Sequence, residues 1–170
     1  SFKGYQDTIC LGPLPEVQKN GQPFSTPEIR TTYEGNKSHF ISCYIEGTVD
    51  FIFGGGEAVF QGCEIKSLRR SLNKEGYITA ASTSKHKKGF YFYQCCLTAE
   101  ADVSNVFLGR PWRNYAKTTF ANCMVGSHIH PSRWDDWGNK ANRKTVTYKE
   151  INNRYTFQSE MKTLDWIDFL

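Results

Sequence analysis

Apolar and polar residues alternate in short runs along most of the chain, with the two-residue period that is typical of β-strands. Around residue 42, Phe40, Ser42 and Tyr44 alternate with isoleucine and cysteine side chains. No stretch before residue 140 carries an apolar stripe with the 3.6-residue period of a helix. The chain up to that point is therefore predicted to consist of strands and loops.

One pattern occurs four times: a phenylalanine, two residues, a cysteine, one residue and then an aliphatic side chain. Its occurrences are Phe40-Cys43-Ile45, Phe60-Cys63-Ile65, Phe92-Cys95-Leu97 and Phe120-Cys123-Val125. They are separated by 20, 32 and 28 residues, a range in which each repeat forms one turn of a solenoid with loops of variable length. We therefore predict an all-β fold, a right-handed single-stranded parallel β-helix, in which the four cysteines stack as an interior ladder.

Other interpretations of the cysteines remain open. A buried free cysteine behaves as a small hydrophobic residue, which suits a core ladder, but disulfides are an alternative. Cys123 also forms a potential zinc-ligand group with His128 and His130, although two histidines on a loop before Pro131 are weak evidence for a metal. Six cysteines in 170 residues, with no Cys-x-x-Cys pair, do not identify a redox compartment.

Clusters of turn-forming residues mark the loops, and the longest insertion is predicted at residues 12–27. After Gly138 the repeat fades, so residues 139–170 are interpreted as a C-terminal tail with a short helix around Ser159–Leu170. No internal boundary is evident. The length and the hydrophobic content of 39% therefore favour one folded domain that spans residues 1–170.

The formal net charge of +4 favours anionic partners, but only one tight basic run occurs, from Lys85 to Lys88. That run is better explained as a solvated loop than as a nucleic-acid patch. No apolar run reaches the 18 residues of a membrane span, and residues 1–10 do not resemble a signal peptide. Because the chain opens on Ser1 and enters strand-like sequence at once, we expect it to be a piece of a longer polypeptide.

An aspartate is unexpected in the apolar run GTVDFIFGGG, because strands disfavour aspartate and its burial needs a partner. The ends of two predicted coils align, as Phe2-x-Gly4-x-x-Asp7 and Ile45-x-Gly47-x-x-Asp50. If these coils are neighbours in register, the two aspartates lie about 4.8 Å apart at the backbone. Two carboxylates that close are expected to have one raised pKa and one that stays low, which supplies an acid and a nucleophile.

Three further side chains fit such a site. Arg110, in FLGRPWRNY, is expected to hold the ionised carboxylate. Trp112 offers an apolar face that stacks on sugar rings, and Gln6 offers an amide N–H to an oxyanion. Each residue also has a structural alternative, because the acids can cap turns, Arg110 can form an ordinary salt bridge and Trp112 can fill the core. Only their joint arrangement favours catalysis.

Five segments, in this order, resemble pectin methylesterases: GYQDT (4–8), YIEGTVDFIFG (44–54), GYITA (76–80), LGRPW (108–112) and HIHPSRWDDW (128–137). The resemblance implies a right-handed parallel β-helix that hydrolyses the methyl esters of galacturonate in pectin and releases methanol. It implies no metal and no other cofactor. By position, it makes Asp50 the nucleophile and Asp7 the general acid and then the general base.

The same resemblance assigns the remaining site residues. Gln6 is the implied oxyanion donor and Arg110 the implied partner of the nucleophile, while Trp112 and Trp134 are the implied substrate-binding rings. Family members carry further coils upstream, with a second glutamine that no segment of this chain matches, so this chain alone is expected to have an incomplete site. Arg133 stands where a glycine is commoner, which is expected to alter how the next ring is presented.

The implied partner is methyl-esterified pectin, in a secreted or cell-wall location, and no nucleic-acid or membrane partner is expected. The full-length protein is expected to be a monomer, with the open first coil of this chain as an edge for association. Two other functions remain open: a β-helix glycosidase that uses the two acids across a glycosidic bond, and a non-catalytic pectin-binding solenoid. A serine esterase is not expected, because the chain has no Gly-x-Ser-x-Gly motif.

Overall fold

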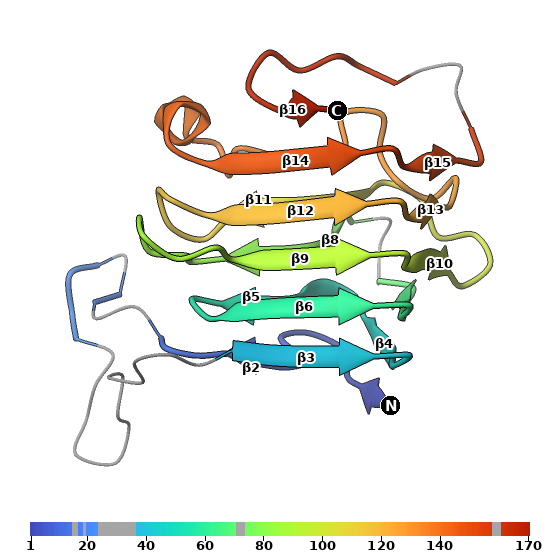
Figure 1. Cartoon of the computed structure of the whole chain (residues 1–170), viewed down its shortest axis with the longest axis horizontal. Coiled ribbons are helices and arrows are strands. Elements are labelled where there is room, and N and C mark those ends of the chain that lie inside the picture. The colour runs from blue at the N-terminus through green and yellow to red at the C-terminus, as the bar shows by residue number, and fades with distance from the viewer. Residues whose placement is uncertain (15–16, 19, 24–36, 71–73, 158–160) are drawn as a thin grey trace.

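The strands form three sheets, each built of parallel strands, and the chain passes from one sheet to the next as it winds (Figure 1). The computed structural model describes residues 1–14, 17–18, 20–23, 37–70, 74–157 and 161–170. All pairings between the named strands are parallel. The described residues therefore form the parallel β-helix that the repeat predicts.

Each sheet is named by its first strand, and neighbours in each series are hydrogen-bonded. The β1 sheet contains β1 (Phe2–Lys3), β4 (Tyr44–Gly47), β7 (Glu64–Ser67), β10 (Cys96–Ala99), β13 (Met124–Val125) and β15 (Arg154–Tyr155). The β2 sheet contains β2 (Ile9–Leu11), β5 (Val49–Gly54), β8 (Gly76–Ala81) and β11 (Val106–Pro111). The β3 sheet contains β3 (Lys37–Ile41), β6 (Glu57–Gln61), β9 (Phe90–Tyr93), β12 (Lys117–Ala121), β14 (Thr147–Ile151) and β16 (Asp168–Phe169).

The phenylalanines of the repeat form a continuous stack on the inner face of the β3 sheet. Phe40, Phe60, Phe92 and Phe120 are register partners along the sheet. Their ring centroids are 4.6, 4.4 and 4.4 Å apart, with interplanar angles of 7°, 6° and 11°. The last three rings are fully buried, so the stack is the centre of the hydrophobic core.

The cysteines of the repeat form the predicted interior ladder. Cys63, Cys95 and Cys123 are buried, and Cys43 lies half-buried at the open end. Each buried thiol donates to the carbonyl oxygen of the phenylalanine in the preceding coil, at 3.4, 3.3 and 3.7 Å. All six cysteines are free, and the described residues contain no group of three potential metal ligands, so the disulfide and zinc interpretations find no support.

A left-handed residue turns the chain from the β3 sheet to the β1 sheet in every coil. The residues at this corner are Ser42, Gly62, Gln94, Asn122 and Asn152, with φ of 51°, 59°, 53°, 53° and 48°. Only one of them is a glycine, so the corner carries a small backbone strain that packing of the coils offsets. This shared corner is why the repeat keeps a constant spacing between its phenylalanine and its cysteine.

The interpretation of residues 139–170 as a C-terminal tail is incomplete, because part of this segment continues the solenoid. Strand β14 pairs with β12, and β15 pairs with β13, so another coil follows. In this coil Glu150, Asn153 and Tyr155 take the places of the phenylalanine, the cysteine and the aliphatic residue. Asn153 accepts from the Cys123 amide at 2.9 Å and donates to the Phe120 carbonyl at 3.1 Å. Polar substitution therefore hid a structural repeat.

The helix predicted around Ser159–Leu170 is wrong, although residues 159–160 lie outside the described part. Residues 161–170 contain no helix, and β16 pairs with β14. A 3₁₀ helix, η2 (Lys140–Lys144), occurs earlier in the tail. Of the loop predicted at residues 12–27, residues 15–16, 19 and 24–27 lie outside the described part. No described helix is long and apolar enough to cross a membrane.

The phenylalanine stack leads to a stability prediction. We expect Phe92→Ala to lower the free energy of unfolding by about 3–5 kcal/mol, because it removes a buried ring that contacts two others and leaves a cavity. The matched control is Tyr91→Ala on the same strand, where the ring is 39% exposed and the expected loss is about 1 kcal/mol or less. Denaturant unfolding followed by circular dichroism measures both, and equal losses would contradict a central role for the stack.

Candidate active site

Adjacent coils bring the two predicted aspartates together. Phe2 pairs with Ile45, and five residues later the Asp7 amide donates to the Val49 carbonyl at 3.3 Å. Asp7 and Asp50 also share the left-handed backbone conformation, with φ of 52° and 50°. Because position and backbone direction both repeat, the carboxylates project side by side on the same face of the solenoid. This confirms the alignment predicted from the sequence.

A local irregularity in β5 explains how an aspartate fits into an apolar run. The register between β5 and β8 shifts between Val49 and Ile52, as in a β-bulge. A bulge redirects side chains, and its left-handed position tolerates aspartate better than the β-branched and aromatic residues around it. Asp50 therefore points out of the core, while Phe51 beside it is fully buried.

Arg110 on β11 binds Asp50 with two hydrogen bonds. The guanidinium Nε donates to Oδ1 at 2.9 Å and an Nη atom donates to Oδ2 at 2.6 Å. The two side chains are only 19% and 11% exposed. Strand β8 lies between β5 and β11, and the register partner of Arg110 there is Ala80, whose small side chain leaves room for the arginine to cross. The predicted ion pair is therefore present.

Two aromatic rings enclose the guanidinium of Arg110. Its Cζ atom lies 3.9 Å from the ring centroid of Tyr77 and 3.8 Å from that of Trp137. Tyr77 in turn stacks on Phe107, with centroids 5.2 Å apart. The sequence reasoning missed Trp137, although the second tryptophan of WDDW was a visible signal. The arginine is thus held by its ion pair with Asp50 and by cation–π contacts with two rings.

The expectation that Trp134 lines a sugar-binding cleft is wrong. Its ring is 2% exposed, stacks on Tyr148 at 4.1 Å and donates from Nε1 to Glu150 at 2.9 Å. The neighbouring Arg133 has φ of 59°, the conformation that glycine adopts without strain. Its Nε donates to the same Glu150 oxygen at 2.8 Å, so the arginine has a buried structural role that a glycine cannot have.

Burial controls the protonation of the acid pair. It raises the pKa of Asp50 above its ordinary value, and Arg110 only partly offsets this effect, while the nearby charge of Asp7 adds to it. Burial also raises the pKa of Asp7, against a hydrogen bond from Gln6 and the charge of Arg110. The expectation that one of the two pKa values stays low is therefore wrong.

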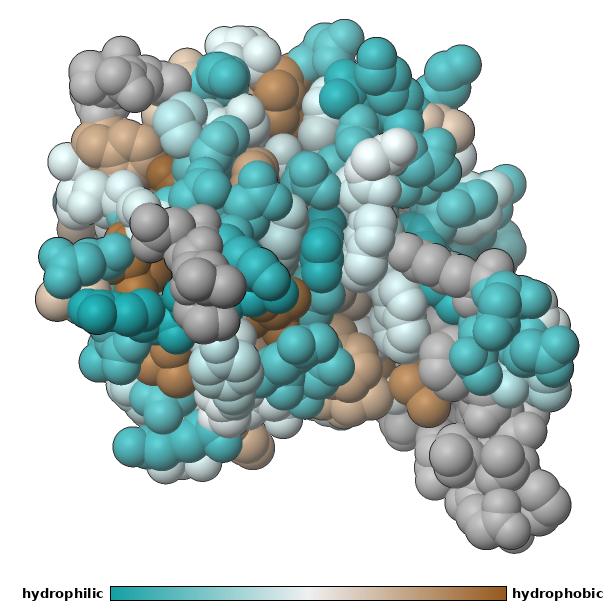
Figure 2. All heavy atoms as spheres, turned by 180° about the vertical axis from the view of Figure 1, so that it is seen from behind, coloured by the Kyte–Doolittle hydropathy of each residue, from teal (hydrophilic) through white to brown (hydrophobic). Residues whose placement is uncertain are grey.

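The two remaining predicted residues lie beside the pair. Gln6 is exposed, and its side chain hydrogen-bonds the Asp7 carboxylate. Trp112 is half-buried and meets Phe53 edge to face, with centroids 5.8 Å apart. Figure 2 views the molecule from behind, on the side of the β2 sheet, and shows apolar side chains set among polar ones.

The chain is similar to several known proteins. A family model described as Pectinesterase matches residues 31–169. Pectinesterase QRT1 of Arabidopsis thaliana is 35% identical over 127 residues, which cover 73% of this chain and 32% of the relative. Pectinesterase/pectinesterase inhibitor U1 of Solanum lycopersicum is 32% identical over 126 residues, covering 69% of this chain and 22% of the relative.

Solved structures show the same architecture. The pectin methylesterase from carrot superposes with a TM-score of 0.79 at 25% identity, over 99% of this chain and 49% of that chain. The pectin methylesterase from Aspergillus niger gives a TM-score of 0.70 at 27% identity, over 98% of this chain and 47% of that chain. The chain thus spans about half of these solved structures, and their fold confirms the right-handed parallel β-helix.

The ion pair at the site leads to a titration prediction. We expect Arg110→Gln to raise the pKa of Asp50 further, because the variant removes the positive charge that favours the ionised carboxylate. Carbon-13 NMR of the aspartate carboxyl groups measures this titration. Lys149→Gln is the control. It removes an exposed ion pair with Asp168 and should leave the pKa of Asp50 unchanged. An unchanged or lowered pKa of Asp50 in the Arg110 variant would contradict the role of the ion pair.

Proposed function

The chain belongs to the pectinesterase family, and we propose that it carries the acid pair of an enzyme that hydrolyses methyl esters of galacturonate in pectin. The observation that supports this function most directly is the placement of Asp7 and Asp50 on adjacent coils, with Arg110 bound to the second. A buried carboxylate oriented by a guanidinium is suited to attack, and a more exposed carboxyl beside it is suited to exchange protons with substrate and water.

In the first half of the proposed reaction, an oxygen of Asp50 attacks the carbonyl carbon of the methyl ester. The carbonyl oxygen, on which negative charge develops, accepts a hydrogen bond from the Gln6 amide. The bond between the carbonyl carbon and the methoxy oxygen then breaks, and Asp7 donates a proton to the methoxy oxygen, which leaves as methanol. An anhydride that joins galacturonate to Asp50 remains.

In the second half, the Asp7 carboxylate accepts a proton from a water molecule, whose oxygen attacks the galacturonyl carbon of the anhydride. The bond to Asp50 breaks, which releases galacturonate and restores both aspartates. Ester and water are thereby converted to acid and methanol, without any redox step. Arg110 stabilises the Asp50 carboxylate at the start and at the end, when its charge is greatest.

The proposed substrate is methyl-esterified pectin, and Trp112 is the proposed ring that stacks on its sugars. A cell-wall location follows from that substrate, and the proposed full-length protein acts as a monomer. The outer edges of β1, β2 and β3 end their sheets, and Ile41 on that side is 59% exposed. We propose that further strands associate along these edges.

Replacement of the nucleophile tests the function directly. In the polypeptide that carries this chain, we expect Asp50→Asn to reduce methanol release from methyl-esterified pectin by on the order of 10⁴-fold or more, because an amide is a poor nucleophile. Pectin binding should change little. Asp168→Asn, far along the solenoid, is the control. Near-normal turnover by the Asp50→Asn variant would remove Asp50 from this role, and released oligosaccharides without methanol would indicate a glycosidase.

Replacement of the acid and base makes a separate prediction. We expect Asp7→Asn to reduce kcat by about 10²- to 10⁴-fold, because proton transfer to methanol and from water loses its carrier. Asp7 is protonated when Asp50 attacks, so the variant should also lose the basic limb that the ionisation of Asp7 gives to the kcat/KM profile. Asp102→Asn, at an exposed turn, is the control. A basic limb that stays in the Asp7→Asn variant would contradict the assigned role of Asp7.

A further inference from the structure

We propose that the outer face of the β3 sheet is a second carbohydrate-binding site, which takes a stretch of polysaccharide whose sugars carry free carboxylates. This face lies in front in Figure 1, whereas the β2 sheet with the acid pair lies behind it. The site is a trough of about 340 Å³ across β3, β6, β9 and β12, and we call it the lysine trough. It shares no residue with the acid pair or with Arg110.

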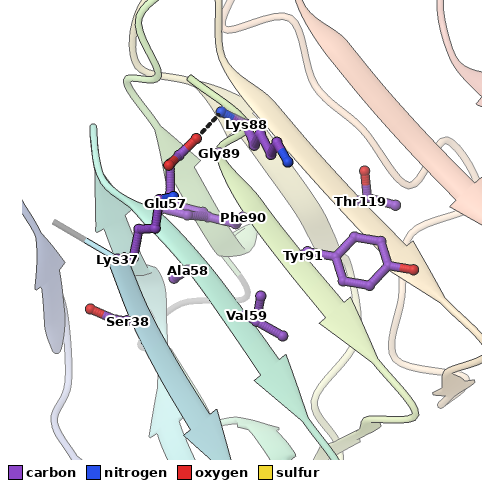
Figure 3. A pocket seen from close by; sticks show the side chains of 10 residues that line it. All are labelled: Lys37, Ser38, Glu57, Ala58, Val59, Lys88, Gly89, Phe90, Tyr91 and Thr119. Carbon is purple, nitrogen blue, oxygen red and sulfur yellow. Dashed lines mark hydrogen bonds between the residues drawn. The ribbon is translucent and has the colours of Figure 1, made fainter. Parts of the chain in front are cut away.

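Strand alternation builds the floor and the walls of the lysine trough. Ala58 and Phe90 point inward and are buried, so they close the floor. Val59 and Tyr91 are register partners whose side chains point outward, and they are 37% and 39% exposed. Figure 3 shows the Tyr91 ring standing beside Thr119 of the next strand. The trough therefore presents apolar surface to solvent without any covering segment among the described residues.

Beyond the residues that line the trough, the aromatic surface continues along β9. The ring of Tyr93, two residues after Tyr91, lies 6.4 Å from it with an interplanar angle of 16°. Two nearly parallel rings on one strand offer the flat apolar faces on which sugar rings pack. Their hydroxyl groups add donors and acceptors for sugar hydroxyls.

The residues that line the trough carry a net positive charge. Lys37 and Lys88 line it and are exposed, and Glu57 is the one acid among its lining residues. The Glu57 carboxylate accepts from the Lys88 backbone amide at 2.7 Å, as Figure 3 shows, so it holds the basic loop in place. Lys117 donates to the carbonyls of Lys85 and Lys87 at 2.7 and 2.8 Å, which fixes the same loop from the next strand.

Charge complementarity and stacking together select the occupant. An aromatic trough alone suits a neutral sugar, and lysines alone suit any polyanion, but the combination matches a uronate polymer. The choice of galacturonate among uronates rests on the proposed function, since de-esterification creates the carboxylates that the lysines recognise. A trough on a separate sheet can therefore hold a de-esterified stretch while the acid pair works on an esterified one. Lys88, the last residue of the basic run from Lys85 to Lys88, thus acquires a binding role in this proposal.

The test uses calorimetric titration with a short galacturonate oligosaccharide that carries no methyl esters. We expect binding at the trough site, which weakens about threefold to tenfold in Tyr91→Ala, the energy of one aromatic contact. The double variant Lys37→Gln and Lys88→Gln should weaken the same site and flatten its dependence on salt. Met124→Ala and Lys140→Gln, at exposed positions outside the trough, are the controls for the ring and for the charge.

Unchanged binding in both trough variants would overturn the proposal. So would equally tight trough binding of a fully methyl-esterified oligosaccharide, or of polyglutamate with no response to Tyr91→Ala, which would indicate nonspecific attraction of polyanions. Methanol release from a short esterified substrate is measured on the same proteins and should not change in Tyr91→Ala. Trough binding without any methanol release by the unsubstituted protein would overturn only the proposed function.

Discussion

Parallel backbone hydrogen bonding between successive coils is the constraint on which the structure depends. It sets a spacing of about 4.8 Å between equivalent residues, so any side chain that recurs at one position meets its counterpart. In the core this produces the phenylalanine stack and the thiol-to-carbonyl bonds of the cysteine ladder. At the surface the same spacing places Asp7 beside Asp50. The acid pair is therefore a ladder like the others, but it is built from two carboxylates that repel each other.

The pKa values of the acid pair depend on a balance between burial of the carboxyl groups and the charge of one cation. Burial raises the pKa of both carboxyl groups, and the guanidinium of Arg110 opposes that effect most strongly at Asp50, which it contacts directly. Tyr77 and Trp137 lie against the guanidinium, whose two hydrogen bonds fall on the two oxygens of a single carboxylate. The aromatic rings thus act on the carboxylate through the arginine that they hold.

A solenoid has several independent faces, and this chain uses them differently. The β2 sheet carries the proposed chemistry, while the β3 sheet carries the lysine trough around Tyr91. Because the first four coils each contribute one strand to each sheet, a polymer can lie across several coils on either face. An extended substrate thus suits a fold whose surfaces are extended in the same direction.

The sequence by itself determined the coil architecture, the cysteine ladder and the pairing of Asp7 with Asp50, because these follow from a period that local composition displays. It could not determine the coil around Glu150, since buried ion pairs and side-chain amides there replace the apolar residues that define the period. Nor could it separate Trp134 from Trp137, two tryptophans of one short motif. Only the tertiary structure decided which ring enters the core and which covers Arg110, because that choice depends on left-handed backbone turns and on partners distant in sequence.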